Sequence, residues 1–283
     1  MPDLPIRVYT PEPILGHPLR LVREMFADLS AGRELAWRLF ARDVSAQYRE
    51  TLLGYMWAFL PPLVASLTFV FLNSQGIVRI SGTTIPYPAF AMIGTLLWQV
   101  FVDGLQTPSD AIARAKPMLA RINFPREAIL LAGLYMVVFN FLIRLLLLLG
   151  VMVWWRVVPG TSIVLFIPAV AALILGGMAI GMLLVPVGSL YGDISRAIPI
   201  AAQFWILLTP VLYPPRTTGL AGILATWNPV SPLITTARES LTNQPLSMLP
   251  AFLAVFAISV LILGLGWMSY RIAMPHLIAR MGG

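Results

Sequence analysis

The sequence predicts an all-α integral membrane protein, and three observations support that fold class. The chain of 283 residues is 58% hydrophobic and 11% charged, with a mean hydropathy of +0.83. Soluble domains carry about 25% charged residues. Apolar residues gather in six segments, and most basic residues gather in alternate connections between them. We therefore expect six transmembrane helices, an N-terminal amphipathic interface helix before them and short re-entrant helices between spans five and six.

Three regions follow one another along the chain. Residues 1–32 are expected to form an N-terminal cytoplasmic segment, residues 33–56 an amphipathic interface helix, and residues 57–283 the transmembrane domain. Within the second region apolar and aromatic residues recur at helical spacing, and the opposite face carries Arg38, Arg42 and Arg49. Such a helix is expected to lie in the membrane interface with its arginines toward phosphates. The alternative is an arginine-rich flank that only fixes topology.

The six apolar segments are close to the length that a membrane requires, because about 20 residues at 1.5 Å rise cross a 30 Å core. The fifth is the shortest and is bounded by prolines, so we expect it to be short, tilted or partly re-entrant. The stretch after it leaves two interpretations open, which are short re-entrant helices and an ordinary surface loop. The spans are expected at 57–78, 87–105, 128–155, 163–190, 198–213 and 248–270.

The positions of Lys and Arg predict the orientation of the chain. Of the 19 basic residues, 14 lie on the side of both termini, four lie on the other side, and Arg144 lies inside the third span. Because basic residues are retained in cytoplasmic loops, both termini and residues 107–127 are expected in the cytoplasm. This distribution favours a topology signal over a nucleic-acid-binding surface. The absence of cysteine from the sequence excludes disulfides.

The sequence indicates no energy source within the chain itself. The single lysine, Lys116, has no glycine near it, so the sequence contains no phosphate-binding P-loop. The spans contain one carboxylate, Asp103, whereas a proton-coupled carrier would place several titratable groups near the midplane. A membrane-embedded transferase would need paired carboxylates or a metal cluster, and the acids are scattered. We expect no cofactor on this chain and an energy supply from a partner.

The connection between the second and third spans mixes basic and apolar side chains. Its prolines predict a short helix that ends before Pro117 and another turn that ends before Pro125. Such a segment suits a groove on a cytoplasmic partner, where apolar and arginine side chains provide binding energy. The alternative is a basic loop that touches only lipid headgroups. The residues expected to couple to the partner are Arg114, Lys116, Met118, Arg121 and Phe124.

Several aromatic residues and one arginine lie within the spans. Trp98 and Trp205 are at mid-span, where rings either pack between helices or, together with Phe101 and Phe204, line a channel. Arg144 is costly in a span, so it is expected to snorkel outward, to pair within the bundle or to contact a substrate.

Two pairs of glycines recur at a spacing of four residues. Gly177 and Gly181 lie in the fourth span, and Gly188 and Gly192 lie at its end and just after it. Small residues at this spacing permit close helix packing. We expect this packing within one subunit rather than between two.

A combination of short motifs runs from about residue 33 to the end of the chain. It consists of Arg42-Asp43, Tyr48-Arg49, Leu53-Gly54, Trp57, Pro61-Pro62, Asn123-Phe124-Pro125-Arg126, Tyr191-Gly192-Asp193-Ile194, Thr209-Pro210-Val211-Leu212-Tyr213-Pro214, Asn228-Pro229 and Arg238. This combination resembles the permease subunit of ABC-2 type exporters, in particular the group that exports O-antigen, capsule and teichoic-acid polysaccharides.

The resemblance implies a homodimeric permease in the bacterial inner membrane, with an ABC-2 type transmembrane domain of six helices per subunit. Its implied partners are two copies of a separate ATPase, which would bind ATP and Mg, and a polysaccharide on a polyprenyl-pyrophosphate carrier. The carrier's pyrophosphate would meet Arg38, Arg42 or Arg49, and the mid-span aromatics would face sugar rings. Where the common pattern has Arg-Asp after span four, this chain has Gly192-Asp193, so no arginine role is implied there. An exporter of a drug or small lipid is an alternative on the same fold, and a membrane transferase is a third.

Overall fold

The computed structural model describes residues 18–49, 54–77, 80, 82–119, 124–215 and 219–281. Every regular element over these residues is helical, which confirms the all-α fold class. The α-helices are α1 (Pro18–Ala31), α2 (Arg33–Arg49), α3 (Leu60–Ser74), α4 (Tyr87–Leu119), α5 (Glu127–Trp154), α6 (Phe166–Leu190), α7 (Gly192–Leu208), α8 (Gly219–Trp227), α9 (Val230–Leu241) and α10 (Leu249–Met281), and two 3-10 helices are η2 (Gly54–Ala58) and η3 (Thr161–Leu165).

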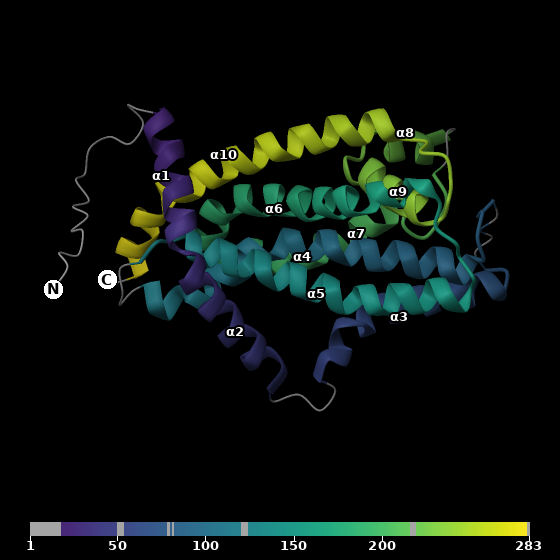
Figure 1. Cartoon of the computed structure of the whole chain (residues 1–283), viewed down its shortest axis with the longest axis horizontal. Coiled ribbons are helices and arrows are strands. Elements are labelled where there is room, and N and C mark those ends of the chain that lie inside the picture. The colour runs from purple at the N-terminus through teal and green to yellow at the C-terminus, as the bar shows by residue number, and fades with distance from the viewer. Residues whose placement is uncertain are drawn as a thin grey trace.

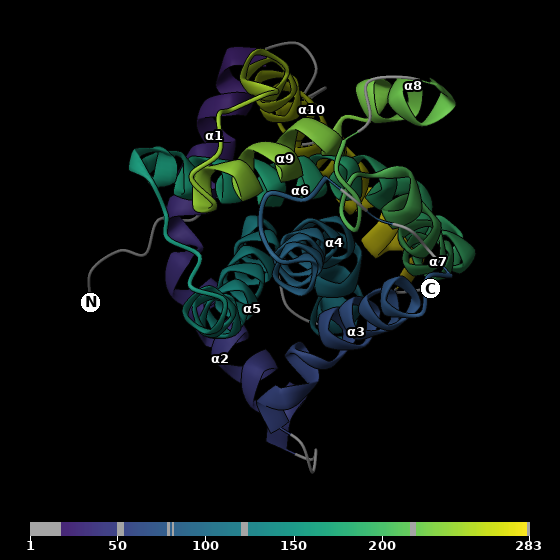
Figure 2. The same cartoon turned by 90° about the vertical axis from the view of Figure 1, so that its right-hand side faces the viewer.

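Helix α4 lies at the centre of the bundle. Viewed along the bundle, α3, α5, α6 and α7 surround it, and α10 lies beyond α6 (Figure 2). The most apolar stretch of α4 is 83% buried within the chain, whereas that of α10 is 17% buried. A helix that is apolar on all sides needs either protein or lipid around it. Helix α4 is therefore a core helix, and α10 leaves most of its surface for lipid.

Four helical stretches are long and apolar enough to cross a membrane, namely Tyr87–Leu119, Glu127–Trp154, Thr161–Gly188 and Leu249–Pro275. They make this a multi-pass membrane protein. They run alongside one another over the length of the molecule (Figure 1). The second span is longer than predicted, because α4 continues through Pro108 and Pro117 to Leu119. The predicted separate helix ending before Pro117 is therefore wrong, and that segment is the last turns of α4.

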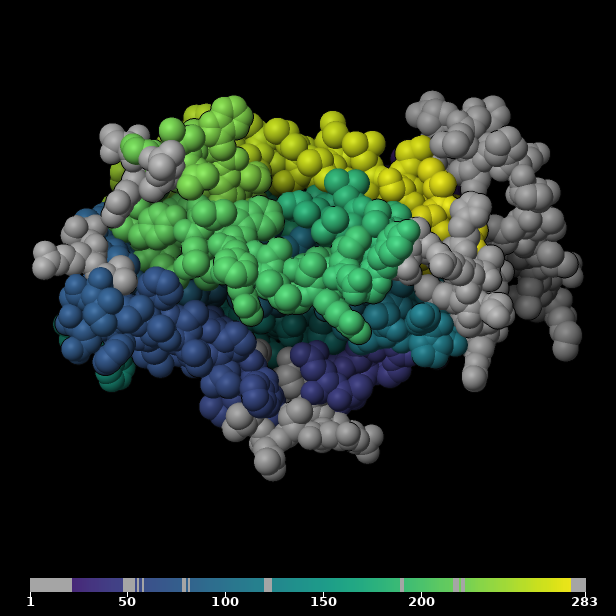
Figure 3. Space-filling model, turned by 180° about the vertical axis from the view of Figure 1, so that it is seen from behind, coloured from purple at the N-terminus to yellow at the C-terminus, as the bar shows by residue number. Residues whose placement is uncertain are grey.

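The helices of the first and fifth predicted spans are short. At 1.5 Å per residue, the 15 residues of α3 and the 17 of α7 reach about 22 and 26 Å, less than a 30 Å core. Helix α3 is followed by Gly76, whose φ of +70° favours glycine. Helix α7 ends at Leu208 because Pro210 forces Thr209 into an extended conformation. Figure 3 shows α7 lying across the rear face, with α3 and α2 below it.

The first glycine pair packs α6 against α4. A Cβ at Gly177 would lie 2.3 Å from the Phe101 carbonyl oxygen, and a Cβ at Gly181 would lie 2.3 Å from that of Leu105. Only glycine permits this approach, which confirms the predicted packing within one subunit. The second pair has no such role, because a Cβ at Gly192 would meet nothing within 4 Å.

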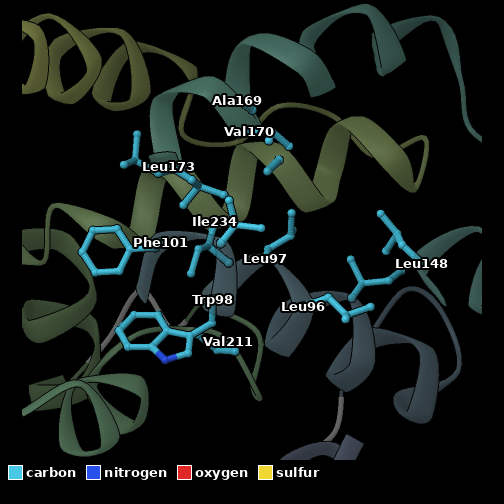
Figure 4. Packing of buried hydrophobic residues seen from close by; sticks show 14 of the residues in the cluster. Leu96, Leu97, Trp98, Phe101, Leu148, Ala169, Val170, Leu173, Val211 and Ile234 are labelled. Atoms are coloured by element: carbon cyan, nitrogen blue, oxygen red, sulfur yellow. The ribbon is translucent and has the colours of Figure 1, made fainter. Parts of the chain in front are cut away.

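The core lies where α9 packs against α6 and α4. Ile234 of α9 packs with Leu97 of α4 and Leu173 of α6, and all three side chains are fully buried (Figure 4). The stretch between the fifth and sixth segments thus contains two short helices, α8 and α9, and the surface-loop alternative is excluded. Nearly every residue of α9 is buried, so this helix is an integral part of the bundle.

The structure describes two parts of the predicted helix over residues 33–56. Helix α2 ends at Arg49, and residues 54–58 form the separate η2. One side of α2 packs against α5, where Ala36 and Leu39 contact Ala128 and Ala132. At the same end, Arg271 of α10 binds carboxylates of α5 and α1, which joins three helices. Helix α2 is therefore held to the bundle by packing, and helix α1 by an ion pair.

Candidate functional site

A polar cavity of about 520 Å³ lies between α2, η2, α4 and α5. Within the described residues this is where charged side chains of the spans meet those of the amphipathic helix. The lining residues are Asp43, Ala46 and Gln47 of α2, Trp57 of η2, Asp103, Gln106, Thr107, Asp110 and Arg114 of α4, and Met136, Asn140 and Arg144 of α5.

An ion pair between α4 and α5 forms the deep side of this cavity. Arg144 Nη1 lies 2.5 Å from Asp103 Oδ2, and the two side chains are 7% and 12% exposed. Asp103 also accepts hydrogen bonds from Gln99 at 3.1 Å and from Asn140 at 3.5 Å. Because a buried charge is tolerated only when it is paired and hydrogen-bonded, these contacts explain how an arginine is held inside a span. Of the three expectations for Arg144, the structure shows pairing within the bundle.

A second ion pair joins α2 to α4 at the side of the cavity nearer the chain ends. Asp43 Oδ2 accepts a hydrogen bond from Arg114 Nε at 3.0 Å, and Asp43 Oδ1 accepts hydrogen bonds from both Nε and Nη2 of Arg42. The Asp43 carboxylate thus connects Arg42, which was expected to meet a pyrophosphate, with Arg114, which was expected to couple to a partner. Sequence reasoning had placed these two sets in separate regions and had given Asp43 no role.

The coupling residues divide into two groups. Arg114 and Lys116 are exposed at the end of α4. Met118 and Phe124 are half-buried, and they pack against apolar side chains of the chain's own helices. Arg121 lies outside the described residues. The apolar part of this segment therefore has partners within the chain, and its exposed part is basic.

The three interface arginines are not gathered into one cluster by the described contacts. Arg38 pairs with Glu34 one turn away, at 2.5 Å, and both side chains are largely exposed. Arg42 is bound to Asp43. The side chain of Arg49 lies outside the described residues. An exposed pair of this kind contributes little to stability, so Arg38 remains available to other anions.

The mid-span aromatic side chains are buried to different extents. Trp98, Phe101 and Trp205 form one ring cluster, with centroids 5.4 to 6.3 Å apart. Trp98 and Phe101 are 5% and 1% exposed and belong to the core (Figure 4). Phe204 is 67% exposed on the outer side of α7. Trp98 and Phe101 therefore pack between helices of this subunit, as one of the two interpretations expected. The ring of Phe204 faces outward.

At the opposite end of the bundle, a buried arginine holds the turn that follows α7. Arg238 of α9 is 4% exposed, donates to the carbonyl oxygens of Pro210 and Val211, and lies 3.9 Å above the ring of Phe90. Burial lowers the pKa of the Arg238 guanidinium to about 9, and neighbouring Glu239 acts in the opposite direction. The group stays charged at neutral pH. The sequence analysis had quoted Arg238 as a motif residue but had assigned it no contact.

A second polar contact fixes the same turn. The Asn228 side chain accepts a hydrogen bond from the Trp205 indole at 3.1 Å and donates to the Thr209 hydroxyl at 2.8 Å. The Asn228 side chain therefore joins the end of α7 to the start of α9. Three of the motif segments quoted above, around 209–214, 228–229 and 238, meet in this one place.

Comparison with known proteins identifies relatives along most of the chain, although no family model matches it. The O-antigen export system permease protein RfbA of Myxococcus xanthus is 26% identical over 249 residues, which cover 87% of this chain and 93% of the relative. Two proteins of the same name from Klebsiella pneumoniae are each 22% identical over 209 residues, or 73% of this chain and 79% of theirs. These similarities confirm the predicted resemblance, and the chain is a homologue of the permease proteins of O-antigen export systems.

Proposed function

We propose that this chain is the transmembrane permease subunit of an ATP-driven ABC exporter for O-antigen-type polysaccharide, carried on polyprenyl pyrophosphate across the bacterial inner membrane. The observation that carries the proposal is the similarity to O-antigen export permeases over 87% of the chain. The multi-pass helical fold agrees with a transport role.

ATP hydrolysis belongs to a separate subunit in this proposal, with two ATPase copies serving two copies of the permease. The absence of a P-loop from the sequence supports the assignment of ATP hydrolysis to a separate subunit. The exposed basic end of α4, with Arg114 and Lys116, is where the ATPase docks. Its motion would reach α2 directly through the Arg114–Asp43 ion pair.

The proposed topology has six crossings and both termini in the cytoplasm. Helices α3 and α7 supply the first and fifth crossings despite their length, because a short helix is accommodated by local thinning of the bilayer. The 14-to-4 distribution of basic residues supports the orientation. Helices α8 and α9 then lie at the outer end, where Arg238 and Asn228 hold them to the end of α7.

The polysaccharide path is proposed along the face of α7 that carries Phe204, with a second copy of the chain opposite. An exposed aromatic ring gives a sliding glycan a flat apolar surface without a fixed charge. Trp98, Phe101 and Trp205 support this face from behind. The carrier's pyrophosphate meets the interface arginines, of which Arg38 is the most exposed.

Deletion and complementation test the proposed function. Cells that lack the gene should lose surface polysaccharide and accumulate lipid-linked polymer inside, and the wild-type gene should restore export. An exporter of a drug or small lipid, the alternative on this fold, would leave the polymer on the surface unchanged in the deletion strain. Copurification of an ATPase with the tagged permease tests the partner separately.

A further inference from the structure

The cavity between α2, η2, α4 and α5 has the size of a ligand site. Pockets for small molecules enclose about 300 to 1,000 Å³, and this one encloses about 520 Å³. Its lining residues come from α2, η2, α4 and α5, and Figure 1 shows α2 below α5 on this side of the bundle. It is separate from the face of α7 proposed for the polysaccharide path.

The charges in the cavity disfavour an anion. Among the described residues, three carboxylates and two guanidinium groups line it. Asp43 pairs with Arg114, and Asp103 pairs with Arg144. The third carboxylate is Asp110, which interacts electrostatically with Arg114 one turn further along α4. A phosphate or pyrophosphate would find both of these guanidinium groups already bound to carboxylates.

Three further polar side chains of the lining suit a ligand rich in hydroxyl groups. Gln106 and Asp110 lie one turn apart on α4, and the Asn140 amide faces the same cavity from α5. Amides both donate and accept hydrogen bonds, and a carboxylate accepts two or more. Sugar hydroxyls both donate and accept hydrogen bonds, so they can bind an amide and a carboxylate together.

An aromatic wall completes the cavity. Trp57 of η2 lines it and is 51% exposed, so its indole is accessible to a ligand. The face of a pyranose ring that carries C–H bonds packs on an indole through dispersion and through the negative face of the π-system. A carbohydrate site typically combines planar polar groups with an aromatic ring, and the lining contains both.

We propose that this cavity binds a short sugar segment of the exported polymer, as a subsite that lies apart from the main path. The inference rests on the proposed function, since it names where that substrate is held. Occupation of the cavity would place sugar beside Asp103–Arg144 and Asp43–Arg114, the two ion pairs that join α4 to α5 and α2. The subsite therefore lies next to the residues through which the ATPase motion would enter the bundle.

Photo-crosslinking in intact cells tests the subsite. Gln106 is replaced by p-benzoylphenylalanine in the full exporter, with Leu146, which is 69% exposed on α5, as the control position. After irradiation and purification, antibodies to the polymer should detect a conjugate at position 106 and none at position 146. Both variants must export polymer, which is scored on the cell surface. Export without a glycan conjugate at position 106 overturns the subsite and leaves the exporter function intact.

A phospholipid conjugate at position 106, detected by mass spectrometry in place of glycan, also overturns the proposal. If deletion of the gene leaves export unchanged, the exporter function fails first and the subsite fails with it. As an independent measurement, the double variant Trp57→Leu/Asp110→Asn should lower export about tenfold at an unchanged yield of the complex. Trp154→Leu, at the exposed end of α5, is the matched control and should export normally. Equal export by the two variants counts against a sugar site.

Discussion

Asp43 of α2 and Arg114 of α4 form an ion pair across 71 positions of sequence, with 3.0 Å between Oδ2 and Nε. Asp43 is 13% exposed and Arg114 is 40% exposed. Such a partly exposed pair contributes modestly to stability, about 1 kcal/mol or less. Its importance lies in its position, because it connects the amphipathic helix to the end of the helix that we propose meets the ATPase.

A double-mutant cycle should show that these two residues act together in export. Asp43→Asn and Arg114→Gln should each lower export severalfold, and the double variant should lose no more than the worse single one. ATPase copurification separates a docking defect from a coupling defect. Arg33→Gln, at an exposed position at the start of the same helix, is the control and should export normally. Fully additive losses would show that Asp43 and Arg114 act independently.

The buried pair between Asp103 and Arg144 should matter for folding. Arg144→Leu leaves a carboxylate unpaired in the bundle, and removal of one partner of a buried pair costs about 3 to 5 kcal/mol. The double variant Asp103→Leu/Arg144→Leu should recover much of the loss, because no charge remains buried. Thermal unfolding in detergent measures the stability of the single and the double variant. A single variant as stable as the wild type would mean that the pair is not buried in the folded protein.

The approach of α6 to α4 gives a test with a matched control. Gly177→Ala places a methyl group 2.3 Å from the Phe101 carbonyl oxygen, so the helices must move apart. Overpacking of this kind costs about 1 to 3 kcal/mol. At Gly150 of α5 an added Cβ would meet no atom within 4 Å, so Gly150→Ala should be neutral or slightly stabilising. Equal melting temperatures for the two variants would contradict the observed packing.

Cysteine labelling tests the topology. Because the sequence contains no cysteine, only the introduced thiol can react. Cysteine at Ala113, exposed near the end of α4, should resist an impermeant thiol reagent added to intact cells. Cysteine at Ile223, 57% exposed on α8, should react. The expectation follows from the excess of basic residues on the side of the termini. The reverse labelling pattern would invert the proposed orientation.

The sequence predicted the helical membrane fold, the second, third, fourth and sixth spans, and the packing role of Gly177 and Gly181, because hydropathy and residue size determine these locally. It did not predict that α4 continues through Pro117, since the flanking apolar residues pack against α5 and outweigh the local effect of proline. Nor did it pair Asp103 with Arg144, although each was noted as a lone charge within the spans. Pairing depends on helix rotation, which only the packed bundle determines.

The last prediction concerns Arg238, which holds the turn after α7 to α9. Arg238→Met removes the donors to the carbonyl oxygens of Pro210 and Val211. Each buried carbonyl left without a partner costs about 1 to 3 kcal/mol. We therefore expect a lower melting temperature in detergent and a loss of export, because the end of α7 is no longer fixed to α9.

The control for this change is Arg196→Met, which removes an exposed arginine from α7 and should alter stability by no more than about 0.5 kcal/mol. Both variants lose one positive charge, so a difference between them reports the buried contacts and not the net charge. If Arg238→Met melts at the same temperature as Arg196→Met, the guanidinium does not hold the turn. In that event the meeting of the three motif segments at this end of the bundle would have to depend on Asn228, which binds both Trp205 and Thr209.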